Sequence, residues 1–373
     1  MVYLDTAASY PLLPEVKTAL AEAFEIHFAN SASSHLLGAQ VSEEIELARK
    51  VIADQIGAFQ SEVIFTSGAT ESNNIAFKSL LLGGDIPTYK KHIITSLIEH
   101  KCIFSITDYF KKLGYDITYL KPDENGLIQA DAVRKSLRDD TALVSIMHVN
   151  NELGSINPIS EIGEVCFENN VLFHSDAAQS FCKQEIDVDE LNVDVLSLSA
   201  HKIGGPKGIG AVYIRDLRKR NLQPVIHGAG QESGIRGGTV AAPLILGFKA
   251  AVESFPKHYE SLKQLNIKEH LLNELSNNSI PFIENAGLHS LDSCISITLP
   301  STNTALLLRE YENSLCLAQG SACSSKEIEA SHVLLALGLD RELADKTFRI
   351  SFPLDVKPDD ISLLVNAIKK ATE

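Results

Sequence analysis

One lysine in this chain lies where burial of its charged amine would be unfavourable unless the amine takes part in a reaction. Lys202 follows the run Ser199-Ala200-His201 and precedes a glycine-rich turn. Strand-like apolar runs at 193–198 and 209–214 flank it, which predicts a tight turn between buried strands. A buried ammonium loses its hydration, which is costly. A lysine at this position therefore indicates that its amine has a chemical role. The reaction that suits it best is a Schiff base with an aldehyde such as pyridoxal 5′-phosphate (PLP).

A second segment offers a site for the phosphate of such a ligand. Residues 66–74 follow a predicted strand and open a predicted helix, and they begin with small side chains. Small residues let backbone N–H groups approach an anion, and the positive end of the helix dipole attracts it. Ser67 and Thr70 would also make ordinary helix caps, so the pattern alone leaves both interpretations open.

Three further polar side chains follow predicted strands. Asp176 lies just after one, and the carboxyl ends of parallel strands are where α/β sheets bind ligands. A carboxylate there suits PLP, whose pyridine nitrogen needs an anion to stay protonated. His100 carries a flat imidazole that titrates near neutral pH. Asn151 has an amide that could hydrogen-bond a ligand. The alternatives are a helix cap for Asp176, a structural role for His100 and a turn for Asn151.

The hydrophobic pattern predicts a scaffold for these side chains. Strand-like and helix-like segments alternate through the first two-thirds of the chain, which predicts a mostly parallel sheet with helices on both faces. The predicted strands are 62–65, 92–97, 115–120, 142–149, 171–175, 193–199 and 209–214. The predicted helices here are 41–56, 69–82 and 101–113. After about residue 245 the pattern becomes α+β, with strands at 293–299 and 348–352 and helices at 249–277, 304–311 and 359–371.

Composition indicates the kind of protein to expect. The chain has 373 residues, of which 45% are hydrophobic and 22% charged, as in a soluble protein of two domains. Its formal net charge of −15 disfavours direct nucleic-acid binding. The longest apolar stretch, 240–248, is too short to cross a membrane, and no signal-peptide pattern is visible. Six cysteines form no C-x-x-C pair, so we expect a reducing, cytoplasmic setting and no metal site.

One cysteine differs from the other five. Cys323 lies in the run 319–325, which is rich in glycine, serine and alanine and therefore predicts a flexible, exposed loop. An exposed thiol is prone to oxidation unless it has a use. Ordinary buried positions are expected for the cysteines at 102, 166, 182, 294 and 316.

Separate segments, in order along nearly the whole chain, resemble the cysteine desulfurases of the NifS/IscS-like type, a branch of the class V aminotransferase family. They include residues 66–74, 174–179, 199–208, 228–239 and 320–324. The resemblance implies a PLP-dependent transferase of fold type I. It would have a mostly parallel seven-stranded sheet in a large domain of residues 16–248. A small α+β domain, residues 1–15 and 249–373, would carry a mobile cysteine loop at about 318–330, as in the long-loop branch.

The same resemblance gives each candidate a role at the cofactor. The residues expected to bind PLP are Ala69, Thr70, His100, Asn151, Asp176, Gln179, Ser199, His201, Lys202 and Thr239. Lys202 would carry the cofactor, and His100 would stack on its ring and move protons. Gln179 would face the phenolic oxygen. Thr239 would reach the PLP phosphate of a partner subunit, which implies a homodimer.

The resemblance also implies the substrate, L-cysteine. Arg349 would bind its carboxylate as a bidentate pair, with help from Asn151, although a surface salt bridge is the alternative for Arg349. Lys202 would remove the Cα proton. Cys323 would take the sulfur as a persulfide, releasing L-alanine, and pass it to a sulfur-acceptor protein. The implied function is that of an L-cysteine desulfurase.

Other functions share part of this pattern. A selenocysteine lyase or another class V PLP enzyme would use the same fold without needing Cys323. A degenerate family member that acts only as a sulfur-assembly scaffold would not need Lys202. The basic cluster at 215–220 would dock a partner or RNA, although a solvated surface turn explains it more simply. The acceptor is left open among iron–sulfur assembly, tRNA thiolation and DNA sulfur modification.

Overall fold

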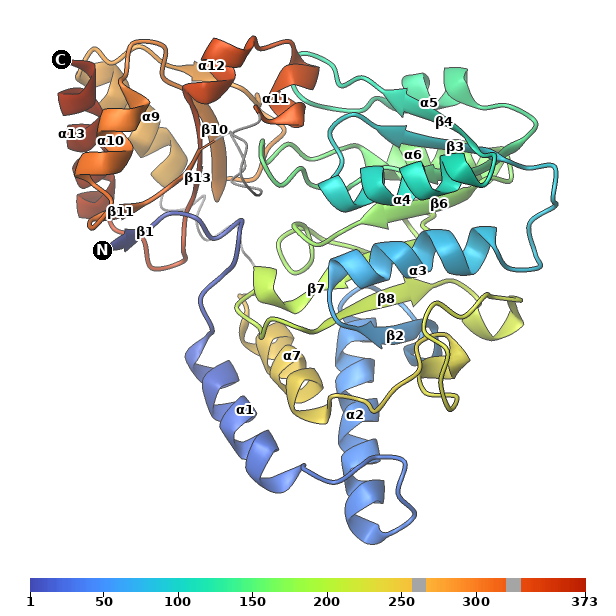
Figure 1. The fold of residues 1–373 in the computed structure, drawn as a ribbon. Coiled ribbons are helices and arrows are strands. Elements are labelled where there is room, and N and C mark those ends of the chain that lie inside the picture. The colour runs from blue at the N-terminus through green and yellow to red at the C-terminus, as the bar shows by residue number, and fades with distance from the viewer. Residues whose placement is uncertain (257–265, 320–329) are drawn as a thin grey trace.

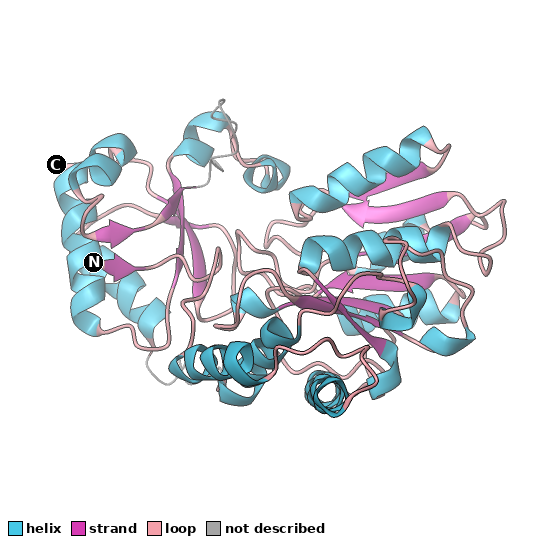
Figure 2. Cartoon of the chain, turned by 60° about the horizontal axis from the view of Figure 1, so that its bottom comes forward, coloured by secondary structure: helices cyan, strands magenta, loops and turns pink. Residues whose placement is uncertain are grey.

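The computed structural model describes residues 1–256, 266–319 and 330–373 (Figure 1). Cys323 and most of the predicted cysteine loop lie outside these residues. The described chain contains two main sheets, and Figure 2 shows them lying apart, each with helices packed against it. In the parts of the chain that the structure describes, no helix is long and apolar enough to span a bilayer.

The larger sheet has seven strands and confirms the predicted mostly parallel α/β architecture. In spatial order its strands are β2 (Val63–Thr66), β8 (Gly210–Ile214), β7 (Val195–Ser199), β6 (Leu172–Asp176), β5 (Thr141–Ser145), β3 (His92–Ser96) and β4 (Asp116–Leu120). Among these seven strands, β8 alone runs in the direction opposite to the other six. The parallel strands β6 and β7 therefore present their carboxyl ends, and the residues that follow them, on one edge of the sheet.

Helices cover both faces of this sheet because its strands are apolar on both sides (Figure 1). Successive strand residues alternate between the two cores: Leu143 packs in one and Val144 in the other. One face is covered by α3 (Ala69–Leu81) and α4 (Lys101–Lys112). The other is covered by α2 (Leu36–Asp54), α5 (Ala130–Ser136), α6 (Ile159–Glu168) and α7 (Ala242–Ser254), with α1 (Pro14–Ile26) packed on α7.

The smaller sheet lies in the C-terminal part of the chain and is antiparallel. Its strands, in order, are β12 (Ala318–Gln319), β13 (Thr347–Ser351), β10 (Cys294–Thr298) and β9 (Ile283–Glu284). The accompanying helices are α9 (Ile267–Asn277), α10 (Thr304–Glu310), α11 (His332–Leu337), α12 (Arg341–Asp345) and α13 (Pro358–Thr372). The N-terminus joins this part, since β1 (Val2–Tyr3) pairs in parallel with β11 (Leu315–Cys316).

The expected continuous helix over 249–277 is wrong. Helix α7 ends at Ser254, and Phe255 is extended (ψ 134°) because the following residue, Pro256, disfavours helical backbone before it. The predicted domain boundary at 248/249 falls inside α7, which packs against α1 and α2 of the large sheet's layer. We therefore propose the same two domains with the large one extended to the end of α7.

Candidate active site

A cavity of about 520 Å³ opens at the carboxyl ends of β6 and β7. Ten of the side chains predicted from the sequence line it: Ala69, Thr70, His100, Asn151, Asp176, Gln179, Ser199, His201, Lys202 and Arg349. Thr239 is exposed and stands apart from this lining in the single described chain, as expected of a residue proposed to serve a partner subunit. Cys323 lies outside the described residues.

The Lys202 amine is held at the cavity by the N-terminal segment. It follows β7 in a single turn of 3₁₀ helix (Ala200–Lys202), and its Nζ donates to the carbonyls of Ala7 (2.6 Å) and Ala8 (2.9 Å). Burial, together with the positive charges of Arg349 and Lys183, lowers the pKa of Lys202 from 10.5 to about 7. The negative charges of Asp176 and Asp5 oppose this lowering. Near neutral pH a large share of the amine is therefore uncharged and able to react.

This lowered pKa predicts how the PLP-free enzyme captures its cofactor as pH changes. Only the neutral amine attacks an aldehyde, so the capture rate should rise with pH and level off above a midpoint near 7. A lysine of ordinary pKa would be neutral in only roughly one molecule in 2,500 at pH 7. The measurement is the rate of absorbance change after mixing apoenzyme with PLP between pH 5.5 and 9. A rate still rising steadily at pH 9 would contradict the lowered value.

Asp176 is fixed in orientation at the end of β6. Its Oδ1 accepts from the backbone N–H of Ala178 (2.9 Å), and its Oδ2 accepts from Nδ2 of Asn73 (2.7 Å). Asn73 is buried on α3, one turn after Thr70. The sequence interpretation did not single it out, although the i, i+3 spacing from Thr70 places both on one side of the helix. These two hydrogen bonds fix the orientation of the carboxylate at the cavity, which suits an anion that pairs with the pyridine nitrogen of PLP.

His100 and Cys102 form another wall. His100 precedes α4 and caps it, since its Nδ1 accepts from the N–H of Cys102 (3.2 Å). Although His100 is exposed to the cavity, desolvation by the surrounding protein lowers its pKa, and the nearby Asp176 charge opposes this. Cys102, expected to be an ordinary buried thiol, lines the cavity beside Asn73. Burial raises its pKa to about 12, which makes it a poor nucleophile at neutral pH.

The turn between β2 and α3 is shaped for close approach to an anion. Gly68 has φ +145°, which glycine tolerates, and it leads directly into α3 at Ala69. The neighbouring Gly210, which begins β8, has no room for a side chain. A Cβ there would clash with the carbonyl of Leu198 and lie 2.7 Å from Cα of Gly68. Opposite, the Ser199 hydroxyl hydrogen-bonds Nδ1 of His201 (2.8 Å). These contacts fix the turn and the side chains predicted to bind phosphate.

A Gly210→Ala substitution should therefore disturb both stability and cofactor binding. Overpacking of this kind typically costs roughly 1–3 kcal/mol, and here it also pushes on Gly68. We expect a lower melting temperature together with weaker PLP binding. The matched control is Gly338→Ala after α11, where φ is +98° and a Cβ would meet no described atom within 4 Å. The control should lose some stability and bind PLP normally; equal PLP affinity in both variants would contradict the close-approach argument.

Three buried polar atoms of residues that line this cavity have no hydrogen-bond partner among the described residues: Nε of Arg349, Oδ1 of Asn151 and Oδ1 of Asn73. The Arg349 side chain is otherwise well fixed, because its Nη1 donates to the Asn151 carbonyl (2.7 Å) and its Nη2 to Oδ1 of Asp5 (2.6 Å). Arg349 lies on β13 of the small sheet, so the second domain delivers a cation to the cavity. Unpaired buried polar groups are unfavourable unless a ligand or water pairs with them.

These residues fit PLP and a substrate with a carboxylate. The cavity holds a lysine of lowered pKa, a fixed carboxylate, a helix N-terminus at Ala69 and Thr70, and unpaired donor and acceptor atoms. Lys202 would carry the aldehyde carbon, Asp176 the ring nitrogen, and the β2–α3 turn the phosphate. Gln179, whose Nε2 donates to the Ala7 carbonyl (2.7 Å), borders the same space.

Comparison with known proteins agrees with this fit. Residues 2–364 match the family Aminotransferase class-V. A mitochondrial cysteine desulfurase of Candida albicans is 41% identical over 387 residues, covering 100% of this chain and 77% of that protein. The cysteine desulfurase IscS of Haemophilus influenzae is 38% identical over 379 residues, covering 100% and 93%. A solved structure of SspA in complex with cysteine superposes with a TM-score of 0.86 at 44% identity, covering 95% of this chain and 99% of that one. With its catalytic cavity and a family match over almost its full length, the chain belongs to the class-V aminotransferase family, whose chemistry depends on PLP.

Proposed function

We propose that this protein is an L-cysteine desulfurase, which converts L-cysteine to L-alanine and retains the sulfur as a persulfide. The observation that carries the proposal is the Lys202 amine of lowered pKa in a cavity that also holds Asp176 and Arg349. The relatives reported above that bear the name cysteine desulfurase support the choice of reaction. The structure of SspA with cysteine bound supports the choice of substrate.

The chain's own residues prepare the substrate. PLP, when bound, supplies an electron sink for the electrons of the Cα–H bond. Arg349 binds the substrate carboxylate through the donor that it leaves unpaired, Nε, while Asp5 and the Asn151 carbonyl hold the rest of its guanidinium. The bound carboxylate orients Cα, because a charge-assisted pair with arginine is directional.

Lys202 then acts as the base for the Cα proton. Its lowered pKa keeps the amine uncharged near neutral pH, which is the state that accepts a proton. His100, whose pKa is lowered by desolvation, lines the same cavity and is a second proton carrier.

We assign sulfur transfer to Cys323, which lies outside the described residues. Its thiolate forms a bond to the substrate sulfur as the substrate Cβ–S bond breaks. The electron pair of that bond stays on Cβ, which takes up a proton to become the methyl group of L-alanine. The sulfur remains on Cys323 as a persulfide and is passed to an acceptor protein.

The direct test is to incubate the purified, PLP-loaded protein with L-cysteine and measure its products. We expect L-alanine to form, a persulfide to be trapped on Cys323 by alkylation, and sulfide to be released when dithiothreitol is added. L-Selenocysteine serves as the comparison, because a selenocysteine lyase would turn it over and leave L-cysteine unchanged. Alanine formation from L-selenocysteine alone would reject the proposed function in favour of that alternative.

We propose that the enzyme is a homodimer. Large apolar side chains are exposed on α1, the start of α2 and the connection between them, including Phe24 (63% exposed), Phe28 (70%) and Leu36 (73%). Figure 1 shows these helices projecting from the body of the large domain. Exposed apolar surface of this kind is typical of a protein–protein interface. In a dimer, Thr239 of one subunit would also lie at the cofactor site of the other subunit, as the family resemblance implies.

Subunit mixing tests the shared site. A Lys202→Ala subunit cannot bind the cofactor covalently, and a Thr239→Asp subunit would place a negative charge against its partner's phosphate. Each homodimer should be inactive. In a mixed dimer one site has an intact Lys202 and receives an intact Thr239, so mixing should restore up to about half of the normal activity per mixed dimer. Lack of recovery, despite subunit exchange shown by mass spectrometry, would contradict a site built from two chains.

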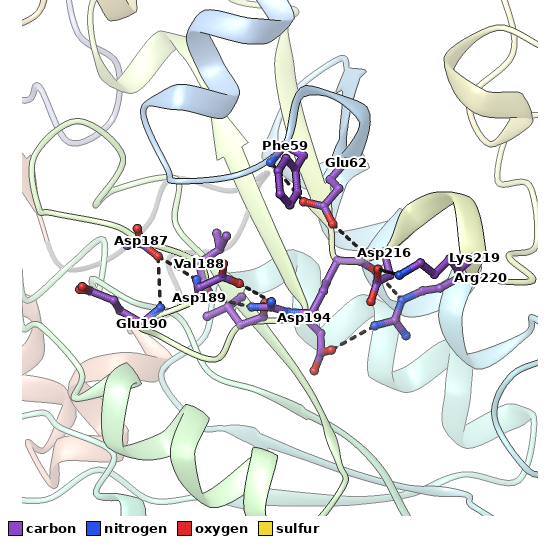
Figure 3. Close-up of polar contacts among 12 residues, drawn as sticks. Phe59, Glu62, Asp187, Val188, Asp189, Glu190, Asp194, Asp216, Lys219 and Arg220 are labelled. Atoms are coloured by element: carbon purple, nitrogen blue, oxygen red, sulfur yellow. Dashed lines mark hydrogen bonds and ion pairs between the residues drawn. The ribbon is translucent and has the colours of Figure 1, made fainter.

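We propose a sulfur-acceptor protein as the partner, and a cytoplasmic location. The five described cysteines are free thiols, which supports a reducing setting. Three cations of the basic cluster 215–220 form ion pairs within the chain. Arg215 pairs with Asp189. Figure 3 shows the other two pairs, Lys219 with Asp216 (2.6 Å) and Arg220 with Asp194 (3.1 Å). These pairs favour the surface-turn interpretation over RNA docking. Persulfide trapping from a lysate would identify the acceptor and hence choose among iron–sulfur assembly, tRNA thiolation and DNA sulfur modification.

A further inference from the structure

A negative charge stands beside the proposed phosphate site. Glu71 lies in the first turn of α3, lines the cavity, and has a side chain only 12% exposed. Burial raises its pKa, but hydrogen bonds from Arg236 and Ser67 outweigh burial and lower it below the ordinary value. The carboxylate is therefore charged at neutral pH, and by itself it would repel a phosphate bound at the same turn.

The position of Arg236 resolves this conflict. Its Nε donates to Oε1 of Glu71 (2.9 Å), and the N–H of Ser67 donates to Oε2 of the same carboxylate (2.7 Å). One carboxylate thus joins the β2–α3 turn, through Ser67, to the glycine-rich loop 228–239, through Arg236. The arginine also cancels the charge that faces the phosphate site.

The loop is fixed at a second point, near the start of the same turn. Glu232 receives two hydrogen bonds from Arg49 (2.7 and 2.8 Å) and one from the N–H of Phe65 in β2 (2.7 Å). Glu232 and Ser233 have φ values of +46° and +55°, which side-chain-bearing residues adopt only when other contacts compensate. The Arg49 pair supplies that compensation. Loop 228–239 is therefore held on both sides of the β2–α3 turn, and Arg236 keeps a defined place.

We propose that Arg236 is a positioning residue for the phosphate of the cofactor, acting through Glu71 and the β2–α3 turn. It does so by neutralising the Glu71 carboxylate, which would otherwise repel a phosphate that faces the first amides of α3. The inference rests on PLP dependence and not on the identity of the substrate or of the sulfur acceptor.

The two members of the pair should behave differently when each is removed. Arg236→Gln leaves the Glu71 charge uncancelled beside the phosphate, so PLP binding should weaken. Glu71→Gln leaves Arg236 as a cation near the phosphate, so PLP binding should be unchanged or tighter. The double variant Glu71→Gln/Arg236→Gln has neither charge and should recover most of the lost affinity. A purely structural ion pair predicts loss in all three variants.

The experiment titrates apoenzyme with PLP and, separately, with pyridoxal, which lacks the phosphate. For Arg236→Gln we expect the Kd of PLP to rise about tenfold or more and that of pyridoxal to change less than about twofold, since an uncancelled like charge beside a bound anion typically costs at least this much. The double variant should return to within about threefold of the parent Kd for PLP. Arg134→Gln, which breaks the exposed Arg134–Glu168 pair on the surface, is the matched control and should bind both ligands normally.

Several outcomes would overturn the proposal. They are equal weakening toward PLP and pyridoxal, a double variant no better than Arg236→Gln, and weaker PLP binding in Glu71→Gln. The last of these decides the matter even if Arg236→Gln does not fold. Failure of the parent protein to bind PLP at all would count against the proposed function, whereas normal PLP binding by Arg236→Gln would count against this inference alone.

Discussion

A Lys202→Ala variant is expected to lose L-cysteine turnover by more than about 10³-fold, because one change removes both the covalent attachment of PLP and the base for the Cα proton. The purified variant should also lack the yellow colour of bound PLP. Folding should be preserved. Among the described residues, the amine that disappears donates to the carbonyls of Ala7 and Ala8, and its burial as a charge is itself unfavourable.

Lys207 offers the matched control, since it lines the same cavity five residues later. Lys207→Ala should keep its colour and most of its activity. Borohydride reduction of the parent enzyme followed by peptide mapping should place the pyridoxyl group on Lys202. A label on Lys207, or a coloured and active Lys202→Ala variant, would refute the assignment.

Cys323→Ser should separate chemistry at the cofactor from sulfur transfer. The variant should bind PLP and L-cysteine normally, because the ten predicted side chains that line the cavity are all unchanged. It should form no persulfide and lose L-cysteine turnover by more than about 10²-fold, since a hydroxyl near neutral pH is a far weaker nucleophile toward sulfur than a thiol. Turnover of L-selenocysteine, which needs no thiolate acceptor, should survive.

The other cysteines provide the comparison for this variant. Cys102 lies in the cavity wall, but its pKa of about 12 leaves almost no thiolate at neutral pH, so Cys102→Ser should keep desulfurase activity. Cys316, which pairs with Tyr3 between β1 and β11, is the other control. Full turnover of L-cysteine by Cys323→Ser would exclude Cys323 as the nucleophile and direct attention to Cys316.

Much of the fold could be predicted from hydrophobic patterning because each buried strand is a short apolar run between polar turns. Strand β5 shows where this fails. The expected strand at 142–149 ends as β5 at Ser145, after which the chain still follows β6: the N–H of Ile146 bonds to the His174 carbonyl. Apolar residues continue beyond the last residue of β5, so the hydrophobic pattern alone cannot show where this strand ends. Pro256 marks the break of the expected helix in the sequence, but the polar helical pattern on both sides of it predicts a continuous helix.

Some residues of the candidate site could likewise be predicted from the sequence, and others could not. Side chains such as Asp176 and Lys202 were predictable because their chemistry is rare at strand ends. The acceptors of the Lys202 amine were not, because the carbonyls of Ala7 and Ala8 carry no sequence signal and lie almost two hundred residues away. Asn73 and Arg236 act through other side chains, so only their contacts reveal them. The role of Thr239 concerns a second chain and stays a prediction.

The N-terminal segment has a consequence for biosynthesis. Residues 2–8 leave the ribosome well before their partners, which include Leu315, Ser351 and Arg349, and the Asp5–Arg349 pair spans 344 residues. At typical translation rates of 5–20 residues per second, Asp5 waits about 20–70 s for its partner. A nascent chain can therefore complete its seven-stranded sheet, which ends at Ile214, long before the substrate side of the cavity closes. A chain cut short by a premature stop after Ile214 would keep Lys202 but lack Arg349, the residue proposed to bind the substrate carboxylate.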